Sequence, residues 1–415
     1  MMSTELLPQL YRTEYSKLTA LLCRRFGLKY IETAEDIASE TFLKASEIWT
    51  RDGLPENPTA WLYTAAKNRT KDYLKRTSIW ETKVKDKITP DDLEEDTDFE
   101  LTPEIISDSQ LALIFAVCDP AISVQSQIGL ALQVLGGFSL EEIADAFLTR
   151  KETIKKRLFR AKANLRKSNF YIHNLTEETI TQRLNSVLKT LYLLFNEGYY
   201  SKSSDVVIRK DLCAHALRLV LILTENSLTD LSETNALLAL MCYQSSRLEA
   251  RIDSAGDSIL FDEQNKDLWD KELIDRGNYF LVNACKNETI SKYHLEAGIA
   301  YRHTTTDENK WIHILDLYNQ LILIEYSPVT ALNRTFAYAK VYGNEKAIIE
   351  AEKIKLENNN YYYSLLGYLY SSINTDKAIE HYETAVKLTK SASERKTLRK
   401  EIQRLINREE EKSGI

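Results

Sequence analysis

Residues Gly136–Lys167 read GGFSLEEIADAFLTRKETIKKRLFRAKANLRK and contain two helical patterns separated by a short break. The pair of glycines at the start is typical of a helix end, because glycine adopts the backbone conformations that stop a helix. Ser139 and Glu142 then stand at the spacing of a capping box. The stretch therefore predicts that one helix ends here and that a short new helix begins after Ser139.

The second pattern is a longer helix, expected from about Lys151 to Lys167. Thr149 and Glu152 repeat the capping-box spacing at its start. One buried face is predicted by apolar residues at helical intervals, namely Ile154, Leu158, Ala161 and Leu165. Two capped helices joined by a tight break have the spacing of a helix-turn-helix.

This second helix is strongly basic, and Glu152 is its only acid. Its candidate DNA-reading side chains are Arg150, Lys151, Thr153, Lys155, Lys156, Arg157 and Arg160. The cations of its N-terminal half would enter a major groove, while Arg160 and Lys162 would lie nearer phosphates. The alternative interpretation is a solvated basic face on an ordinary helical hairpin.

The whole chain has 415 residues, with only 12 glycines and 7 prolines. So few breakers, together with abundant helix-forming residues, predict an all-α protein of two or three domains. The expected parts are a helical bundle over 5–76, an acidic flexible linker over 77–104, a small helix-turn-helix module over 105–169, and an all-helical extension over 170–415. Because the net charge is -7, binding to nucleic acid would depend on local basic segments.

Two further segments stand out in the N-terminal bundle. WLYTAAKNRTKDYLKR, Trp61–Arg76, combines aromatic residues with cations, a composition that suits single-stranded DNA because bases stack on flat side chains. The same aromatic residues are equally compatible with a helix core. AEDIASETFLKA, Ala34–Ala45, alternates acids with apolar residues, which by itself indicates an amphipathic helix with a solvated acidic face.

The extension carries weakly repeated helix-pair patterns. LLGYLYSSINTDKAIEHYETAVKL, 365–388, has small and aromatic residues at tetratricopeptide intervals, and ALNRTFAYAKVYGNEKAIIEAEKI, 331–354, repeats the pattern less clearly. Within LYLLFNEGYYS, 191–201, Asn196 and Glu197 precede Gly198. These polar residues indicate either a binding site or side chains that cap a helix end at the glycine.

The segments 34–45, 61–76 and 141–165, in this order, resemble region 2.2, regions 2.3 to 2.4 and region 4.2 of extracytoplasmic-function (ECF) sigma factors. The acidic stretch lies where that family has its inter-domain linker. The stretches FAVCDPAISVQSQIGLALQVLGGFS, LYLLFNEGYYS and SPVTALNRTFAYAKVYG resemble the subgroup with a C-terminal tetratricopeptide-like domain. The resemblance implies a sigma factor that binds core RNA polymerase and directs promoter-specific transcription initiation, regulated in cis by its extension.

The resemblance also implies roles for single residues. The clamp helices of the largest polymerase subunit would meet a face formed by Asp36, Glu40, Phe42 and Leu43, and the flap region is a second expected contact. The -10 promoter element would be held by Tyr63, Asn68, Lys71, Lys75 and Arg76. The -35 element would be read by the basic helix after Thr149. A regulatory protein is the partner expected for the extension.

Other classes of protein are disfavoured by what the sequence lacks. It has no Gly-rich phosphate loop, nucleophile elbow or paired metal-ligand motif, so we expect no enzyme, cofactor or metal site. Its five cysteines include no C-x-x-C pair, and no apolar run is long enough for a membrane span. We therefore expect a cytoplasmic protein. Two alternatives stay open: a tetratricopeptide adaptor, and a helix-turn-helix regulator that is not a sigma factor.

Overall fold

The computed structural model describes residues 2–84, 102–147, 149–168, 170, 172, 175–200, 208–253, 259–286, 289–389 and 391–413. All regular elements in these ranges are helices, which confirms the all-α prediction. Most of the predicted acidic linker lies outside the described residues. The chain divides into two compact units, 1–191 and 192–415, and each is described by itself.

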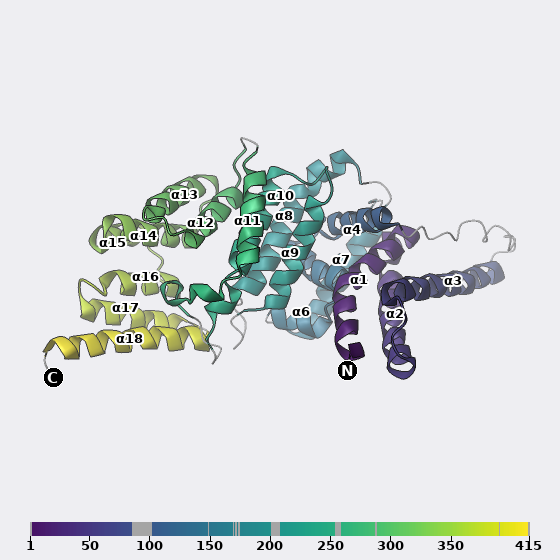
Figure 1. Cartoon of the computed structure of the whole chain (residues 1–415), viewed down its shortest axis with the longest axis horizontal. Helices are drawn as coiled ribbons and strands as arrows, with labels where there is room; N and C mark the ends of the chain where they lie inside the picture. The colour runs from purple at the N-terminus through teal and green to yellow at the C-terminus, as the bar shows by residue number, and fades with distance from the viewer. Residues whose placement is uncertain are drawn as a thin grey trace. The chain divides into compact units, whose positions relative to one another are not determined.

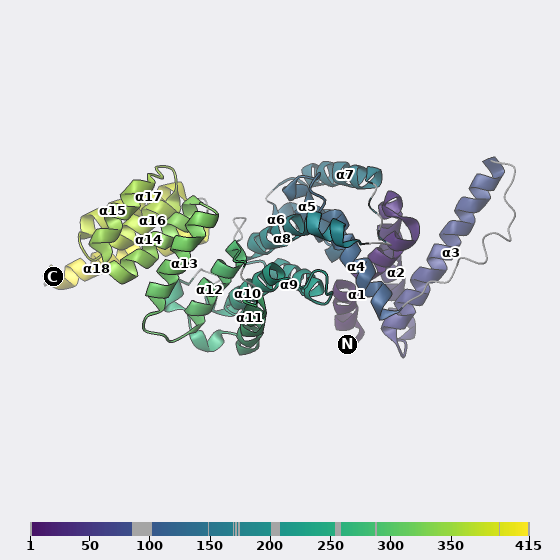
Figure 2. The same ribbon diagram turned by 90° about the horizontal axis from the view of Figure 1, so that it is seen from above.

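The first unit begins with three long helices and one short 3-10 turn: α1 (Met2–Phe26), η1 (Leu28–Tyr30), α2 (Ile31–Asp52) and α3 (Pro58–Val84). Gly27 and Gly53 follow α1 and α2 with φ of 82° and 89°, a conformation that favours glycine and stops each helix. The helices share a core that includes Leu22 and Leu62. The C-terminal half of α3 projects away from α1 and α2 (Figure 2).

Helix α3 continues to Val84, so it extends into the linker predicted from residue 77. The extra stretch, TSIWETKV, has no apolar periodicity but also no glycine or proline. A helix that has already formed adds such residues at little cost, because propagation is easier than nucleation.

The second half of this unit contains α4 (Pro103–Val117), α5 (Val124–Leu130), a π-helical turn η3 (Ala131–Leu135), α6 (Leu140–Ala146) and α7 (Lys151–Lys167). The predicted capping box at α6 is confirmed, since the Glu142 amide donates to Ser139 Oγ and the Ser139 amide donates to the Glu142 carboxylate. The second predicted box is wrong. The Thr149 amide donates to the Ala144 carbonyl and so belongs to the end of α6, which leaves Arg150 as the N-cap of α7.

Helix α1 packs against both halves of the first unit (Figure 1). The Tyr11 hydroxyl donates to the Gly137 carbonyl at 3.1 Å. A Cβ at Gly137 would lie 2.6 Å from the Tyr11 ring, and φ is 69° there, so only glycine fits this turn. The two modules that the sequence predicts as separate are therefore in direct contact.

The first part of α8 (Glu177–Tyr199) also belongs to the first unit. Arg183 pairs with Asp119 at 3.0 Å, and the Thr190 hydroxyl donates to the buried side chain of Gln127. The boundary between the compact units consequently falls at Leu191, whereas the sequence predicts it near residue 170.

The second unit is a succession of helices: α9 (Lys210–Thr224), α10 (Ser232–Ser245), α11 (Lys271–Ala284), α12 (Lys292–Thr304), α13 (Lys310–Ile324), α14 (Pro328–Tyr342), α15 (Asn344–Ile354), α16 (Asn360–Tyr370), α17 (Thr375–Leu388) and α18 (Ala392–Ser413). From α12 onward, each helix packs on the next one (Figure 1). The α16–α17 pair is close because a Cβ at Gly367 would lie 2.8 Å from the Tyr382 ring.

The core of this unit is divided into successive clusters. Leu240 and Ala297 share one cluster, Ile299 and Ala337 share the next, and Leu366 belongs to a third. Each helix pair thus buries its apolar face against its neighbours, as stacked helical repeats do. Among the helices that the structure describes, none combines the length and the apolar composition that a membrane span requires.

Candidate functional site

The acidic face of α2 is formed by Asp36, Glu40 and Leu43, which are all exposed, and the Leu43 side chain is 62% exposed. Partial burial raises the pKa of Asp36, and the charge of Glu40 acts in the same direction. Glu40 pairs with Arg69 of α3. This ion pair is solvent-exposed, so a basic surface of a partner would replace Arg69 at low cost.

Phe42 does not belong to that face. It is 4% exposed, and its ring centroid lies 5.0 Å from the Tyr11 ring and 6.5 Å from the Tyr15 ring. The family resemblance implied that Phe42 shares the face of Leu43, but consecutive helical residues point in different directions. Phe42 holds α2 against α1 and leaves Leu43 as the exposed apolar residue.

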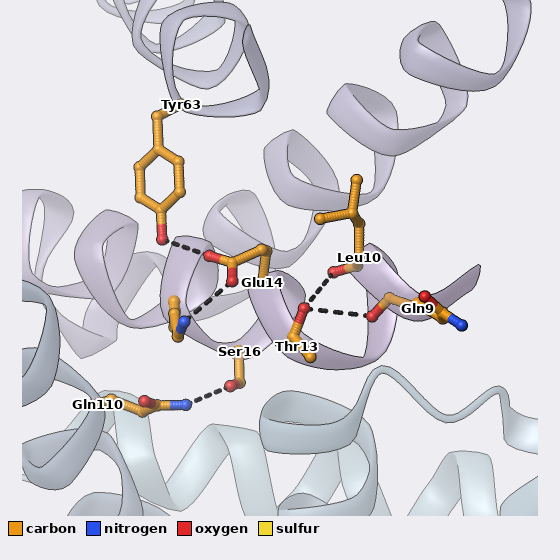
Figure 3. A network of polar contacts seen from close by, with 8 residues as sticks. Gln9, Leu10, Thr13, Glu14, Ser16, Tyr63 and Gln110 are labelled. Atoms are coloured by element: carbon orange, nitrogen blue, oxygen red, sulfur yellow. Dashed lines mark hydrogen bonds and ion pairs between the residues drawn. The ribbon is translucent and has the colours of Figure 1, made fainter. Parts of the chain in front are cut away.

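The DNA-facing candidates on α3 separate into two groups. The first group reaches solvent: Asn68, Lys75 and Arg76 are exposed, and Lys71 is partly buried. By their helical spacing, Asn68, Lys71 and Lys75 lie on one face of α3. Tyr63 is 7% exposed, and its hydroxyl donates to Glu14 Oε2 at 2.9 Å (Figure 3). Burial and the Glu14 charge raise the pKa of Tyr63. In this structure Tyr63 is a core residue that offers no surface to a base.

Helix α7 presents the predicted buried face, because Ile154, Leu158, Ala161 and Leu165 are all buried. Its exposed candidates are Arg150, Lys151, Thr153, Lys155, Lys156 and Arg160. Arg157 is partly buried, with its guanidinium 5.6 Å from the centre of the Phe147 ring. Lys151 pairs with Glu141 of α6. The N-terminal half of α7 therefore exposes several cations, among them Lys155 and Lys156.

The C-terminal half of α7 contacts α2. Lys162 Nζ lies 2.6 Å from Glu35 Oε2, and both side chains are largely buried. Arg166 pairs with Glu32 one turn earlier on α2. The sequence predicts that Lys162 lies near phosphates. This prediction does not hold in this packing, because the Lys162 ammonium group pairs with Glu35 inside the protein. Sequence reasoning missed this contact, although Glu35 falls between two buried residues of α2, Ala34 and Ile37.

Comparisons with known proteins agree with this geometry. Residues 10–79, which span most of α1, α2 and the greater part of α3, match the family described as Sigma-70 region 2. The chain is thus similar to Sigma-70 region 2 over these residues. This match supports a role in transcription initiation.

Two other findings concern the rest of the chain. Residues 183–285 match a family of unknown function, DUF6596. An uncharacterized protein of Rhizobium meliloti (strain 1021) is 30% identical over 385 residues, which is 90% of each chain. No solved structure matches the chain. Helices α6 and α7, where the sequence predicts a helix-turn-helix, lie outside both matched ranges.

In the part of the chain that the structure describes, no three His, Cys, Asp or Glu side chains are grouped so that they could hold a metal ion. The site is thus a set of surfaces: an acidic face on α2, a basic face on α3 and a basic helix α7. These surfaces are suited to binding a protein and a polyanion.

Proposed function

We propose that this chain is an ECF-type sigma factor that directs core RNA polymerase to specific promoters. The observation that carries the proposal is the region 2 match on helices whose exposed faces are acidic on α2 and basic on α3. The α2 face of Asp36, Glu40 and Leu43 would dock on the clamp helices of the largest subunit, and a further contact would be made with the flap region. Charge complementarity would guide the encounter.

At the -10 element, Asn68 would contact a flipped base, and Lys71, Lys75 and Arg76 would contact phosphates. An amide can read the edge of an unpaired base, while cations follow the strand without selecting its sequence. Tyr63 is buried in this structure, so its role beside the base would require release from Glu14.

At the -35 element, α7 would enter the major groove. Its exposed Thr153, Lys155 and Lys156 lie near the N-terminal end of the helix, where recognition helices usually contact base edges. The capped helix α6 supports α7 in the helix-turn-helix arrangement.

Promoter binding would require α7 to leave α2. The -10 and -35 elements lie at different positions along the promoter, and the duplex between them extends by about 3.4 Å per base pair. In the structure the two helices touch through the Lys162–Glu35 pair. We infer that this contact belongs to a closed form and that it opens when both elements are read.

Run-off transcription with purified core polymerase and a promoter library tests the proposal. The wild-type chain should give transcripts from a set of promoters that share -10 and -35 sequences. The variant Asp36→Arg with Glu40→Arg should give none, while Glu104→Arg with Asp108→Arg, a pair with the same spacing on the exposed side of α4, should remain active. Sequence-specific DNA binding without polymerase-dependent transcription would favour the helix-turn-helix regulator instead.

The extension is proposed to be a tetratricopeptide-like domain that regulates the sigma factor in cis and binds a regulatory protein. Support comes from its stacked helix pairs and from α8, which runs without a break from the first unit into the second. A chain that ends at Leu191 should differ from the full chain in promoter-specific transcription at equal folded concentration, as checked by circular dichroism. Equal activity and equal response would contradict regulation in cis.

A further inference from the structure

A partly buried carboxyl group in the second unit lacks an ionic partner. Glu296 lies on α12, and its Oε1 accepts a hydrogen bond from the Tyr192 hydroxyl of α8 at 3.2 Å. Among the described residues, no lysine or arginine forms an ion pair with Glu296. A carboxylate that is removed from water and left uncompensated is costly, which makes it a candidate for an incoming cation.

Tyrosine rings surround this carboxyl group on several elements. The rings of Tyr192 and Tyr293 have centroids 5.5 Å apart. Tyr200, directly after α8, and Tyr318 of α13 are close enough for the charge of Glu296 to raise the pKa of their hydroxyls. Burial is the larger cause for the partly buried Tyr318, whereas Tyr200 is 56% exposed. The faces of such rings attract cations, and their carbon atoms cover the apolar part of a ligand.

A second acceptor belongs to the same network. Asn196 hydrogen-bonds the Tyr192 hydroxyl, and its Oδ1 is buried without a hydrogen-bond partner. The sequence left open whether this asparagine caps a helix end. The capping alternative is wrong, because α8 continues to Tyr199 and Gly198 lies inside the helix, where a Cβ would be 2.8 Å from the Arg209 carbonyl.

The cations near this cluster are already paired. Lys292 Nζ lies 2.8 Å from Glu325 and over the rings of Tyr192 and Tyr293. Arg251 donates to the Tyr199 carbonyl at 2.8 Å and lies over the Tyr199 ring. Neither is an ion-pair partner of Glu296. The cluster therefore keeps two acceptors, the Glu296 carboxylate and Asn196 Oδ1, for one additional positive group.

We propose that Glu296, Asn196 and the surrounding tyrosines form a binding site for an organic ammonium ion. The Glu296 carboxylate and Asn196 Oδ1 would accept hydrogen bonds from the ammonium N–H groups, and the tyrosine rings would cover the adjoining carbon atoms. Three of these residues, Tyr192, Asn196 and Tyr200, lie in the part of the chain that matches the family of unknown function. The proposal does not depend on promoter recognition, and it goes beyond the sigma-factor role.

Isothermal titration calorimetry of the full chain at about pH 8 tests this site with two probes, n-butylammonium and Nα-acetyl-lysine amide. Both carry the ammonium group, and tighter binding of the second would point to a lysine side chain as the natural source. Glu296→Gln keeps an acceptor for Tyr192 but removes the charge, so it should weaken binding about tenfold or more. The matched control is Glu249→Gln, an exposed acid of the same unit that pairs with Lys210.

Binding should also depend on pH in the wild-type chain alone. Burial raises the pKa of Glu296 to about 7, against the opposing effects of the Tyr192 hydrogen bond and the Lys292 charge. Affinity should therefore fall about tenfold from about pH 8 to about pH 6, because the carboxyl is then mostly protonated. The facing Tyr192, Tyr200 and Tyr318 have raised pKa values and stay neutral over this range.

Two results would overturn the proposal. One is the absence of saturable binding of either probe by the folded wild-type chain. The other is equal affinity and equal pH dependence in Glu296→Gln, provided that circular dichroism shows a native helical spectrum for the variant. A loss of binding in both Glu296→Gln and Glu249→Gln would show a nonspecific charge effect and would also count against the site.

Discussion

The contact between α2 and α7 can be broken at one buried ion pair. Lys162 and Glu35 lie 2.6 Å apart, and their side chains are 11% and 9% exposed. In Lys162→Met the carboxyl of Glu35 stays buried and loses the cation that lowers its pKa, which burial already raises. Removing one partner of a buried pair costs about 3 kcal/mol. The balance between the closed and open forms should therefore shift by roughly 100-fold toward the open form.

A distance measurement between spin labels checks this shift directly. Exposed Lys44 of α2 and Lys167 of α7 can be replaced by cysteine and labelled, with Cys285→Ser removing the one exposed native thiol. The labelled chain that keeps Lys162 should give a single short distance between the two labels. Lys162→Met should add a second population with a longer and broader distance distribution. Promoter-specific transcription by Lys162→Met should rise if opening limits promoter binding.

A second variant separates the ion pair from simple damage to the fold. Glu35→Leu with Lys162→Met replaces the buried pair by apolar side chains, a change that is usually neutral or stabilising. It should restore the short distance. The reasoning is refuted if Lys162→Met lowers the melting temperature but leaves the distance distribution unchanged, because the contact would then not separate two states.

The other predictions address the surfaces and the extension. Asp36→Arg with Glu40→Arg should abolish co-purification with core polymerase while the helical spectrum stays native, since the acids would complement a basic partner; retained binding would place the docking surface elsewhere. Lys155→Ala with Lys156→Ala should reduce the slope of log K against log salt by about 1.8, as expected for two lost phosphate contacts, and an unchanged slope would mean that α7 does not face DNA. Folding raises the pKa of Glu296 from 4.5 to about 7, so the folded state binds this proton more tightly than the unfolded state does. The free energy of unfolding should therefore fall by about 3 kcal/mol as the pH rises from below the lower pKa to above the higher one. Denaturant titrations at about pH 5 and pH 8 should show this fall in the wild-type chain and not in Glu296→Gln; an equal fall in both would assign it to other groups.

Local sequence signals predicted the helices and much of their start and end points. The capping box of Ser139 and Glu142 needs only residues of one turn, so it can be recognised from the sequence. The buried stripe of α7 depends on helical periodicity alone and was also predicted correctly. The Thr149 box failed because a more distant residue, Ala144, takes the Thr149 amide. Local spacing cannot show such competition.

Sequence also identified the surfaces but not their availability. The family-like segments were found from residue types and order, and the region 2 match covers the first two of them, 34–45 and 61–76. Whether a side chain at such a position is exposed depends on what packs over it. Phe42 and Tyr63 are buried by α1, through the rings of Tyr11 and Tyr15 and through Glu14. Aromatic residues suit both a core and a base-binding surface, so their type does not distinguish the two.

By itself, the sequence determined the helical class, the two basic segments and the acidic face of α2, because these follow from composition and from spacing within a few turns. Only the tertiary structure showed that Lys162 meets Glu35, or that Glu296 meets Tyr192 without a cation. In both cases the partners are about a hundred residues apart in the chain. Burial changes the energy of a charged group far more than its neighbours in sequence do, and burial is decided by long-range packing.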